Sequence, residues 1–238
     1  MNKPSEYSFL GNSGKIMQLA FHKDTLVSYQ ENSHVHAYKI PIKTINSNIS
    51  IQPTNKLNTG KYASNKDFCE IYSHSNFFDI TQSGKLFSMS YDKKIKIFDL
   101  SSDQCNESFK YSKNKSSQKE KIRGIKVSND EEKIVIHHSK GLKVFKKNGN
   151  DGGWSKSGRL NNCGDLVRAN WIDDNFIFAS SKSSPKNSYL LTLNDLQGSQ
   201  VYVCLDSDPW CQAYNSIDNL IAVGYRDSQI KILHGGPG

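Results

Sequence analysis

Apolar and polar residues alternate along most of this chain, in short runs separated by turn-forming residues. Ile95 and Ile97 alternate with lysines, which is the period of a half-buried strand. The run Leu86–Ser90 precedes them, and the turn residues Asp92–Lys94 between the two runs indicate a hairpin. The segment 83–100 is therefore predicted to form two antiparallel strands joined by a short turn.

The same strand–turn–strand pattern recurs four more times, starting at Thr25, Lys133, Asn175 and Asn219. An aromatic residue or leucine ends the second strand of each copy. The intervals between these residues are 60, 47, 48 and 40, measured along Tyr38, Phe98, Phe145, Leu193 and Leu233. Intervals of roughly 40–45 residues are typical of repeats that each form a four-stranded blade. A polar insertion at 41–66 lengthens the first interval.

Together these residues resemble the WD-repeat β-propeller family, with Phe98 where the family usually has tryptophan. The resemblance implies an all-β fold, a WD-repeat-like β-propeller of about five recognisable four-stranded blades. Such a propeller is expected to be open or part of a larger one, and a closed five-bladed ring is the alternative. The resemblance extends over nearly the whole chain, so a single β-propeller domain is expected over 1–238. Its blades are expected at 6–40, 67–100, 106–146, 154–194 and 199–234.

Each blade needs a strand-like run on either side of the repeated hairpin. Innermost strands are expected at Lys15–Phe21, Phe77–Ile80, Ile122–Val127, Asp165–Trp171 and Trp210–Tyr214. Outermost strands are expected to open each blade, at Glu6–Leu10, Cys69–Tyr72, Asn106–Lys110, Trp154–Leu160 and Gln200–Leu205.

The resemblance also implies a structural network within the blades. In the family a histidine, a serine or threonine, an aspartate and a tryptophan are hydrogen-bonded within one blade. The second blade matches at His74, Ser88 and Asp92, but Phe98 cannot donate the indole hydrogen bond. The fifth blade keeps the aspartate as Asp227. These residues are predicted to stabilise the blades and to have no direct functional role.

A candidate partner-binding surface follows from the same alignment. In the family, the residue before the turn aspartate often lies on the top surface, and here Tyr91 and Arg226 hold that position. Arg168 and Trp210 begin innermost strands near the expected channel mouth. Tyr, Trp and Arg are enriched in interface hot spots. The alternative for Trp210 is that it packs between blades.

The net charge of +8 and a sequence pI near 9.1 favour contact with nucleic acid or acidic protein surfaces. A candidate basic patch consists of Lys113, Lys115, Lys119 and Lys121. No aromatic residues are interleaved there to stack on bases. A solvated loop is therefore favoured over an RNA-binding patch.

Several residues could suggest metal or thiol chemistry. His34 and His36 share a strand face and, with His22, could imitate a metal site. A solvated strand face is favoured, because no cysteine or carboxylate has ligand spacing nearby. The five cysteines form no C-x-x-C pair, and the N-terminus lacks a secretory signal. Reduced, buried structural thiols are therefore expected.

The expected function is a non-catalytic protein–protein interaction scaffold, a subunit of an intracellular multiprotein complex in the nucleus or cytoplasm. No catalytic, cofactor-binding or metal-binding residues are expected, because no convergent acid–base, nucleophile or phosphate-loop pattern is present. One or more protein partners are expected, and if the propeller is open a partner is expected to complete it. The alternative is an RNA-associated propeller, acting in ribosome assembly or as a noncatalytic subunit of an RNA-modifying enzyme. No apolar run is long enough to span a membrane, so membrane insertion is not expected.

Overall fold

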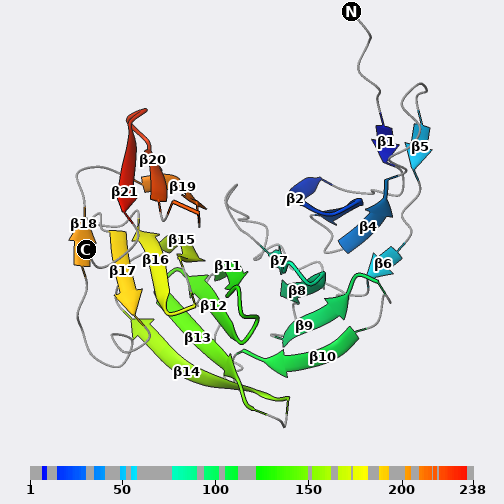
Figure 1. Ribbon diagram of the computed structural model, residues 1–238, viewed down its shortest axis with the longest axis horizontal. Coiled ribbons are helices and arrows are strands. Elements are labelled where there is room, and N and C mark those ends of the chain that lie inside the picture. Colours follow the sequence, from blue (N-terminus) through cyan, green and yellow to red (C-terminus); the bar gives the residue numbers. More distant parts are fainter. Residues whose placement is uncertain are drawn as a thin grey trace, which may run out of the picture. The chain divides into compact units, whose positions relative to one another are not determined.

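All regular elements in the described part of the chain are β-strands, as the sequence predicts (Figure 1). The computed structural model describes residues 7–9, 15–30, 35–40, 49–51, 55–57, 77–89, 94–101, 105–111, 122–149, 152–161, 166–172, 174–181, 188–192, 202–204, 209–215, 217–218 and 220–234. None of these residues belongs to a helix that could cross a membrane. The chain divides into two compact units, which are described separately. Unit 1 comprises Met1–Glu70 and Ile80–Lys110, and unit 2 comprises Ile71–Asp79 and Tyr111–Gly238.

Unit 1 is built from two four-stranded sheets and a two-stranded pair. The first sheet has the order β2 (Ile16–His22), β3 (Thr25–Gln30), β4 (Val35–Lys39) and β6 (Asn55–Leu57). The second has the order β10 (Cys105–Lys110), β9 (Lys94–Asp99), β8 (Lys85–Met89) and β7 (Phe78–Ile80), and the unit boundary falls within β7. The parallel pair joins β1 (Tyr7–Phe9) to β5 (Ile49–Ile51).

Unit 2 contains two further four-stranded antiparallel sheets and one sheet with three described strands. The first consists of β11 (Ile122–Val127), β12 (Lys133–His138), β13 (Gly141–Lys147) and β14 (Trp154–Asn161). The second consists of β15 (Leu166–Trp171), β16 (Phe176–Ser181), β17 (Ser188–Thr192) and β18 (Tyr202–Cys204). The third consists of β19 (Pro209–Asn215), β20 (Leu220–Tyr225) and β21 (Ile230–His234).

The predicted hairpins are confirmed. The outermost strands, however, were assigned to the wrong sheets. Residues 106–110 were expected to open the blade 106–146, whereas β10 pairs with β9 and closes the preceding sheet. In the same way β14 pairs with β13, and β18 pairs with β17. At the N-terminus, β1 pairs with β5. Each outermost strand thus follows its sheet in sequence, because short connections favour pairing with the strand just completed. The single-domain assignment and the blade count stay predictions.

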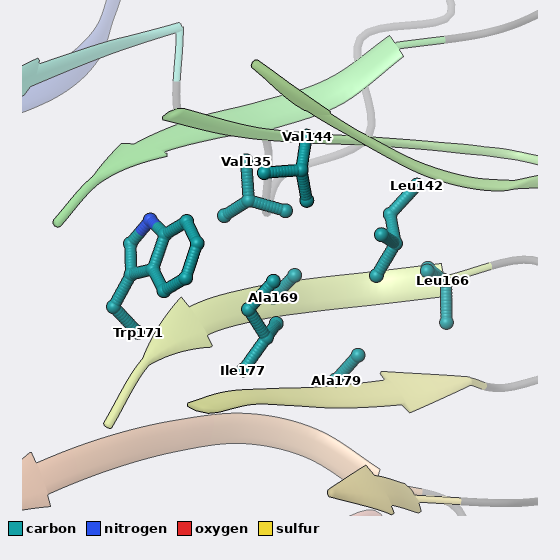
Figure 2. Packing of buried hydrophobic residues seen from close by; sticks show 8 residues of the cluster. All are labelled: Val135, Leu142, Val144, Leu166, Ala169, Trp171, Ile177 and Ala179. Atoms are coloured by element: carbon teal, nitrogen blue, oxygen red, sulfur yellow. The ribbon is translucent and has the colours of Figure 1, made fainter. Parts of the chain in front are cut away.

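The sheets of unit 2 pack face to face through apolar side chains. Eight buried residues form one cluster between the β11–β14 and β15–β18 sheets (Figure 2): Val135, Leu142, Val144, Leu166, Ala169, Trp171, Ile177 and Ala179. A second cluster joins the β15–β18 sheet to the last sheet: Ile172, Phe178, Ile221, Val223 and Tyr225. The β-branched and small residues of these strands thus form the flat apolar faces that sheet packing requires.

Polar contacts also link successive elements of unit 2. Asp79 of β7 accepts hydrogen bonds from the Lys126 ammonium at 2.7 Å and from the Val127 amide at 2.8 Å, both on β11. The Trp171 indole on β15 donates to the Lys126 carbonyl at 3.1 Å. A charge-assisted bond and an indole bond therefore attach Asp79 and Trp171 to β11.

The turn between β11 and β12 is held by a carboxylate. Burial alone would raise the pKa of Asp130, but hydrogen bonds from Lys133, Ser128 and the Glu132 amide outweigh it, so this pKa lies below its ordinary value of 3.8. Across the sheet interface, the Asp130 amide donates to the Asp174 carboxylate at 3.0 Å. Asp174 therefore joins two neighbouring turns.

Candidate protein-interaction surface

A β-bulge recurs near the start of the innermost strand in four of the sheets. The register shifts between Ile16 and Gln18 in β2, Ile122 and Gly124 in β11, Leu166 and Arg168 in β15, and Pro209 and Cys211 in β19. The residues left over are Met17, Arg123, Val167 and Trp210. Bulges re-aim side chains and are common at the rims of β-structures and beside functional sites.

In unit 2 three of these bulges define one end of the sheets, which we call the bulge end. Here β11, β15 and β19 begin, and the antiparallel strands β12, β16 and β20 finish. The opposite end carries the turns that join each innermost strand to its neighbour. The bulge end and the opposite end therefore consist of different sets of turns and strand ends.

Contacts between the sheets show that their bulge ends are aligned. Near the bulge end, the side-chain amide Nε2 of Gln212 on β19 donates to the Phe178 backbone carbonyl at 3.2 Å, and the Ser180 hydroxyl donates to Gln212 Oε1 at 3.3 Å. Figure 2 shows Leu166 beside Leu142 toward this end, and Trp171 beside Val135 toward the other. The three sheets thus run in the same direction within unit 2.

Three residues of the predicted partner-binding surface lie at this common end. Trp210 occupies the bulge of β19, next to Pro209, which pairs with Tyr225. Arg226 follows Tyr225 directly and is exposed at the tip of the β20–β21 turn. Arg168 follows the bulge of β15, where it pairs with Ser180. Strands separated by a whole repeat in sequence therefore bring these three positions to one end of unit 2.

The β20–β21 turn explains why Arg226 projects into solvent. The Tyr225 amide donates to the Gln229 carbonyl at 2.8 Å, and Ser228 adopts a positive φ of 66°. This is the geometry of a three-residue hairpin loop ending in a left-handed residue. Asp227 is exposed and accepts the Gln229 amide at 3.2 Å. Asp227 thus stabilises its own turn, as short polar side chains commonly do.

The two ends of unit 2 differ in charge. At the bulge end the inner strands and turns carry Arg123, Arg168, Lys140 and Arg226, and Asp227 is the one acidic residue among the described positions of these segments. The turns at the opposite end carry acidic residues: Asp130, Glu131, Glu132, Asp174 and Asp218. Among the described residues of these segments, the bulge end is therefore the more cationic of the two ends.

Arg168 has an unusual environment for an arginine. Its side chain is half-buried, and its Nε atom is shielded from solvent without a hydrogen-bond partner in the part of the chain that the structure describes. Arg123, one repeat earlier, is 6% exposed. The neighbouring strand ends are polar as well, since Ser180, Ser181 and His138 are buried there. The bulge end thus contains both buried polar side chains and cationic side chains.

Most of the predicted structural network lies outside the described residues. This applies to His74 and Asp92, to Tyr91 of the candidate surface, and to the basic patch of Lys113, Lys115, Lys119 and Lys121. Ser88 is buried in β8, and no described residue hydrogen-bonds its Oγ atom. The side chain of Trp210 is likewise not described. The roles assigned to all these residues stay predictions.

Two expectations about reactive side chains are wrong. His36 was expected on a solvated face, but it is 3% exposed, and its Nδ1 atom lies 2.9 Å from Gln30 Nε2 and 3.3 Å from the Tyr38 hydroxyl. His36 is therefore buried in a polar network with Gln30 of β3 and Tyr38 of β4. Cys105 and Cys211 were expected to be buried, but both are exposed free thiols.

Within the described ranges, no cluster of three or more His, Cys, Asp or Glu side chains is arranged to hold a metal ion. Sequence reasoning did not place Arg123 and Lys140 at the same end as Arg168, and it missed the contacts of Asp79 with β11. A signal for Arg123 was available, because Arg123 and Arg168 are separated by 45 residues, close to the repeat interval.

Comparison with known proteins supports the architecture. No protein-family model and no curated protein sequence matches the chain. Its structure is similar to the WD40 domain of coronin from Toxoplasma gondii, with a TM-score of 0.69, 14% identity, and coverage of 96% of this chain and 58% of that chain. It is also similar to the β-propeller domain of Cps50 (Swd1) from Myceliophteria thermophila, with a TM-score of 0.65, 10% identity, and coverage of 94% and 72%.

The computationally designed Ika8 protein is a third similar structure, with a TM-score of 0.66, 13% identity, and coverage of 96% of this chain and 61% of the Ika8 chain. At these identities the likeness concerns the fold alone. The chain has a WD40-type β-propeller fold, and it spans 58% of the length of the coronin chain that it matches. Folds of this type generally serve as binding platforms, but function has to be argued from the site.

Proposed function

We propose that this chain is a non-catalytic scaffold that binds a protein partner through the bulge end of unit 2, as a subunit of an intracellular complex in the nucleus or cytoplasm. The observation that carries the proposal is the strand register, which brings Arg168, Trp210 and Arg226 to one end. Arginine and tryptophan at the centre of a face are the side chains that most often dominate binding energy. The β-propeller fold supports this role, because it presents side chains from several sheets on one rigid face.

A charge-reversal experiment tests the proposal. Arg226 and Lys140 are exposed at the bulge end, so Arg226→Glu/Lys140→Glu changes the face without disturbing the core. Lys146→Glu/Lys156→Glu is the matched control, because both lysines are exposed on the outer strands β13 and β14, away from the bulge end. Tagged wild-type and variant chains are expressed in the native cells, purified by affinity, and compared by quantitative mass spectrometry.

We expect the bulge-end variant to lose at least one protein that the wild type and the control retain, with all three chains melting at similar temperatures. Equal recovery of every partner by both variants would contradict the proposal. The alternative, an RNA-associated role, predicts instead that RNA is recovered and that neutralising Lys113, Lys115, Lys119 and Lys121 abolishes this recovery. The same purifications therefore separate the two functions.

A second contact with a partner is proposed at the last sheet. Its inner face packs on the β15–β18 sheet, whereas Ile230 and Ile232 on its other face are 73% and 59% exposed. The register places Ala222 opposite Ile232 and Gly224 opposite Ile230, which gives this face a flat, small-residue surface suited to another sheet. A β-sheet of a partner protein would cover this face and complete the propeller. Loss of a partner from Ile230→Lys/Ile232→Lys, but not from the outer-strand control, would support this contact, and retention would refute it.

A further inference from the structure

We infer that copies of this chain associate with one another, so that the last sheet (β19, β20 and β21) of one copy packs face to face on the first sheet (β2, β3, β4 and β6) of another. The inference rests on the second contact proposed above, because it names the molecule that covers the last sheet. The bulge-end contact with a partner does not depend on it. It follows from the exposure of two sheet faces, their register, and the charges of the turns beside them.

The interfaces between sheets in unit 2 join two different faces. In the first cluster, Val135 and Val144 belong to one sheet, whereas Ala169 and Trp171 belong to the next sheet in sequence. We call the face that contacts the following sheet the forward face, and the face that contacts the preceding sheet the backward face. The second cluster has the same arrangement, because Phe178 on the forward face of its sheet packs on the backward face of the last sheet. A forward face is therefore covered by a backward face.

The last sheet leaves its forward face exposed. Ile230 and Ile232 on this face of β21 are 73% and 59% exposed. Counted from the hairpin turn, they hold the positions of Leu142 and Val144 in β13, which are completely buried. Two large apolar side chains are thus exposed at positions where the earlier repeat buries them. Contiguous exposed apolar residues of this kind mark interaction sites.

The first sheet leaves the complementary backward face exposed at β2. Leu19 and Phe21 on this face are 59% and 65% exposed. Counted from the bulge, they hold the positions of Ala169 and Trp171 in β15, which are buried against the preceding sheet. The chain thus carries an uncovered face of each kind, and a second copy supplies the surface that each face lacks. A contact between two different faces of identical chains is heterologous, so it builds rings or rows of copies.

The turns beside the two faces carry opposite charges. In unit 2 the turn after one inner strand is hydrogen-bonded through Asp130 to the turn after the next inner strand. The same alignment between copies brings exposed Asp218 of the β19–β20 turn to exposed Lys23 of the β2–β3 turn. The other charge of the β2–β3 turn, Asp24, is paired with Lys39 at 3.4 Å. Asp218 and Lys23 therefore favour this orientation of the two copies.

Analytical ultracentrifugation of the purified full chain tests the inference. The first-sheet variant is Leu19→Lys/Phe21→Lys, and the last-sheet variant is Ile230→Lys/Ile232→Lys. Each removes one face and keeps the other, and all four positions are exposed, so the core stays intact. Circular dichroism and melting temperatures verify the fold, and the outer-strand control is measured alongside. Molecular masses are determined over a range of micromolar concentrations, for each chain alone and for an equimolar mixture of the two variants.

We expect the wild type and the control to form dimers or larger assemblies as their concentration rises. Each variant alone should stay monomeric, because every copy lacks one of the two faces. Their mixture should form a dimer and nothing larger, because it retains one intact pair of faces. Lys23→Glu should weaken self-association about two- to fivefold, and Lys23→Glu/Asp218→Lys in one chain should restore it, since the charges are then exchanged.

Several results would overturn the inference. Self-association of either variant alone would mean that identical faces meet, and a mixture that stays monomeric would mean that the two faces do not bind each other. A charge exchange that restores nothing would contradict the alignment of the turns. A wild type that stays monomeric, with a Tm lowered by both variants, would mean that the faces meet within one chain.

The cell experiments separate this inference from the proposed function. If the purified wild type is monomeric but Ile230→Lys/Ile232→Lys loses a partner in cells, a different protein covers the last sheet. The second contact proposed above then stands, and only the association of copies fails. If the copies associate as expected but the bulge-end variant retains every partner, the association stands and the bulge-end proposal fails.

Discussion

Replacing Trp171 tests the packing between two sheets on which the architecture of unit 2 depends. The side chain is 7% exposed and lies in the cluster between the β11–β14 and β15–β18 sheets, and its indole N–H donates to the Lys126 carbonyl at 3.1 Å. Trp171→Phe removes this donor and part of the ring, whereas Trp171→Ala removes the ring altogether. The two substitutions therefore separate the hydrogen bond from the apolar contacts.

The expected magnitudes follow from these contacts. Losing the hydrogen bond costs about 1 kcal/mol, and the smaller ring adds a comparable loss of packing, so Trp171→Phe should lower the free energy of unfolding by about 2 kcal/mol. Truncation of a buried tryptophan to alanine costs about 3–5 kcal/mol. For a chain of this size, about 2 kcal/mol corresponds to a fall in Tm of roughly 4–8 °C.

Urea denaturation followed by circular dichroism and tryptophan fluorescence measures these differences. Lys146→Ala on the exposed side of β13 is the control, and it should stay within about 0.5 kcal/mol of the wild type. A free energy of unfolding for Trp171→Phe that also stays within about 0.5 kcal/mol would refute the reasoning. Trp171 would then not join the two sheets, and the stacked arrangement would lose its main support.

Three further substitutions probe other contacts. Asp79→Ala should lower the free energy of unfolding by about 2–3 kcal/mol, because it orphans a lysine and a backbone amide of β11, and Asp79→Asn should lower it by roughly half as much, which urea titration would resolve. Gly141→Ala should lower Tm strongly, since Gly141 has a φ of +145° and a Cβ there would lie 2.0 Å from the Leu160 carbonyl oxygen; Gly149→Ala, with open space around it, is the control that should not. The lowered pKa of Asp130 means that its stabilising contribution is complete above its ordinary value of 3.8 and is lost as the pH falls through the folded-state pKa. The stability difference between Asp130→Asn and wild type should therefore be largest near neutral pH and should shrink in acid, and a difference independent of pH would contradict this role.

Periodic features were predictable from the sequence because they depend on local pattern. The alternation at Ile95 and Ile97 corresponds to β9, where both side chains are buried. Repeats specify the interval between sheets, but not which sheet an outer strand joins. The same repeat interval allows an outer strand to pair with the preceding sheet or with the following sheet. In the structure β10, β14 and β18 pair with the preceding sheet, to which their connections are short.

Features of the site depend on register and burial, which the sequence expresses weakly. A β-bulge has no sequence signature in these strands, so the placement of Arg168 after a bulge could not be derived. His36 shows the same limit: it was expected on a solvated strand face, but it is 3% exposed and lies against Gln30 and Tyr38. The location of Trp210 and Arg226 at one end was predictable, because both positions follow from the repeat.

Site-specific photo-cross-linking tests the central claim most directly. A photoreactive amino acid is placed at Gln229, exposed at the bulge end, and in a second chain at Ile217, which is 91% exposed in the turn at the opposite end of the same sheet. After irradiation in the native cells, cross-linked proteins are identified by mass spectrometry. We predict that position 229 captures a specific protein partner, that position 217 does not, and that Arg226→Glu/Lys140→Glu abolishes the capture. Equal capture at both positions, or capture at position 217 alone, would contradict the assignment of the bulge end as the partner-binding face.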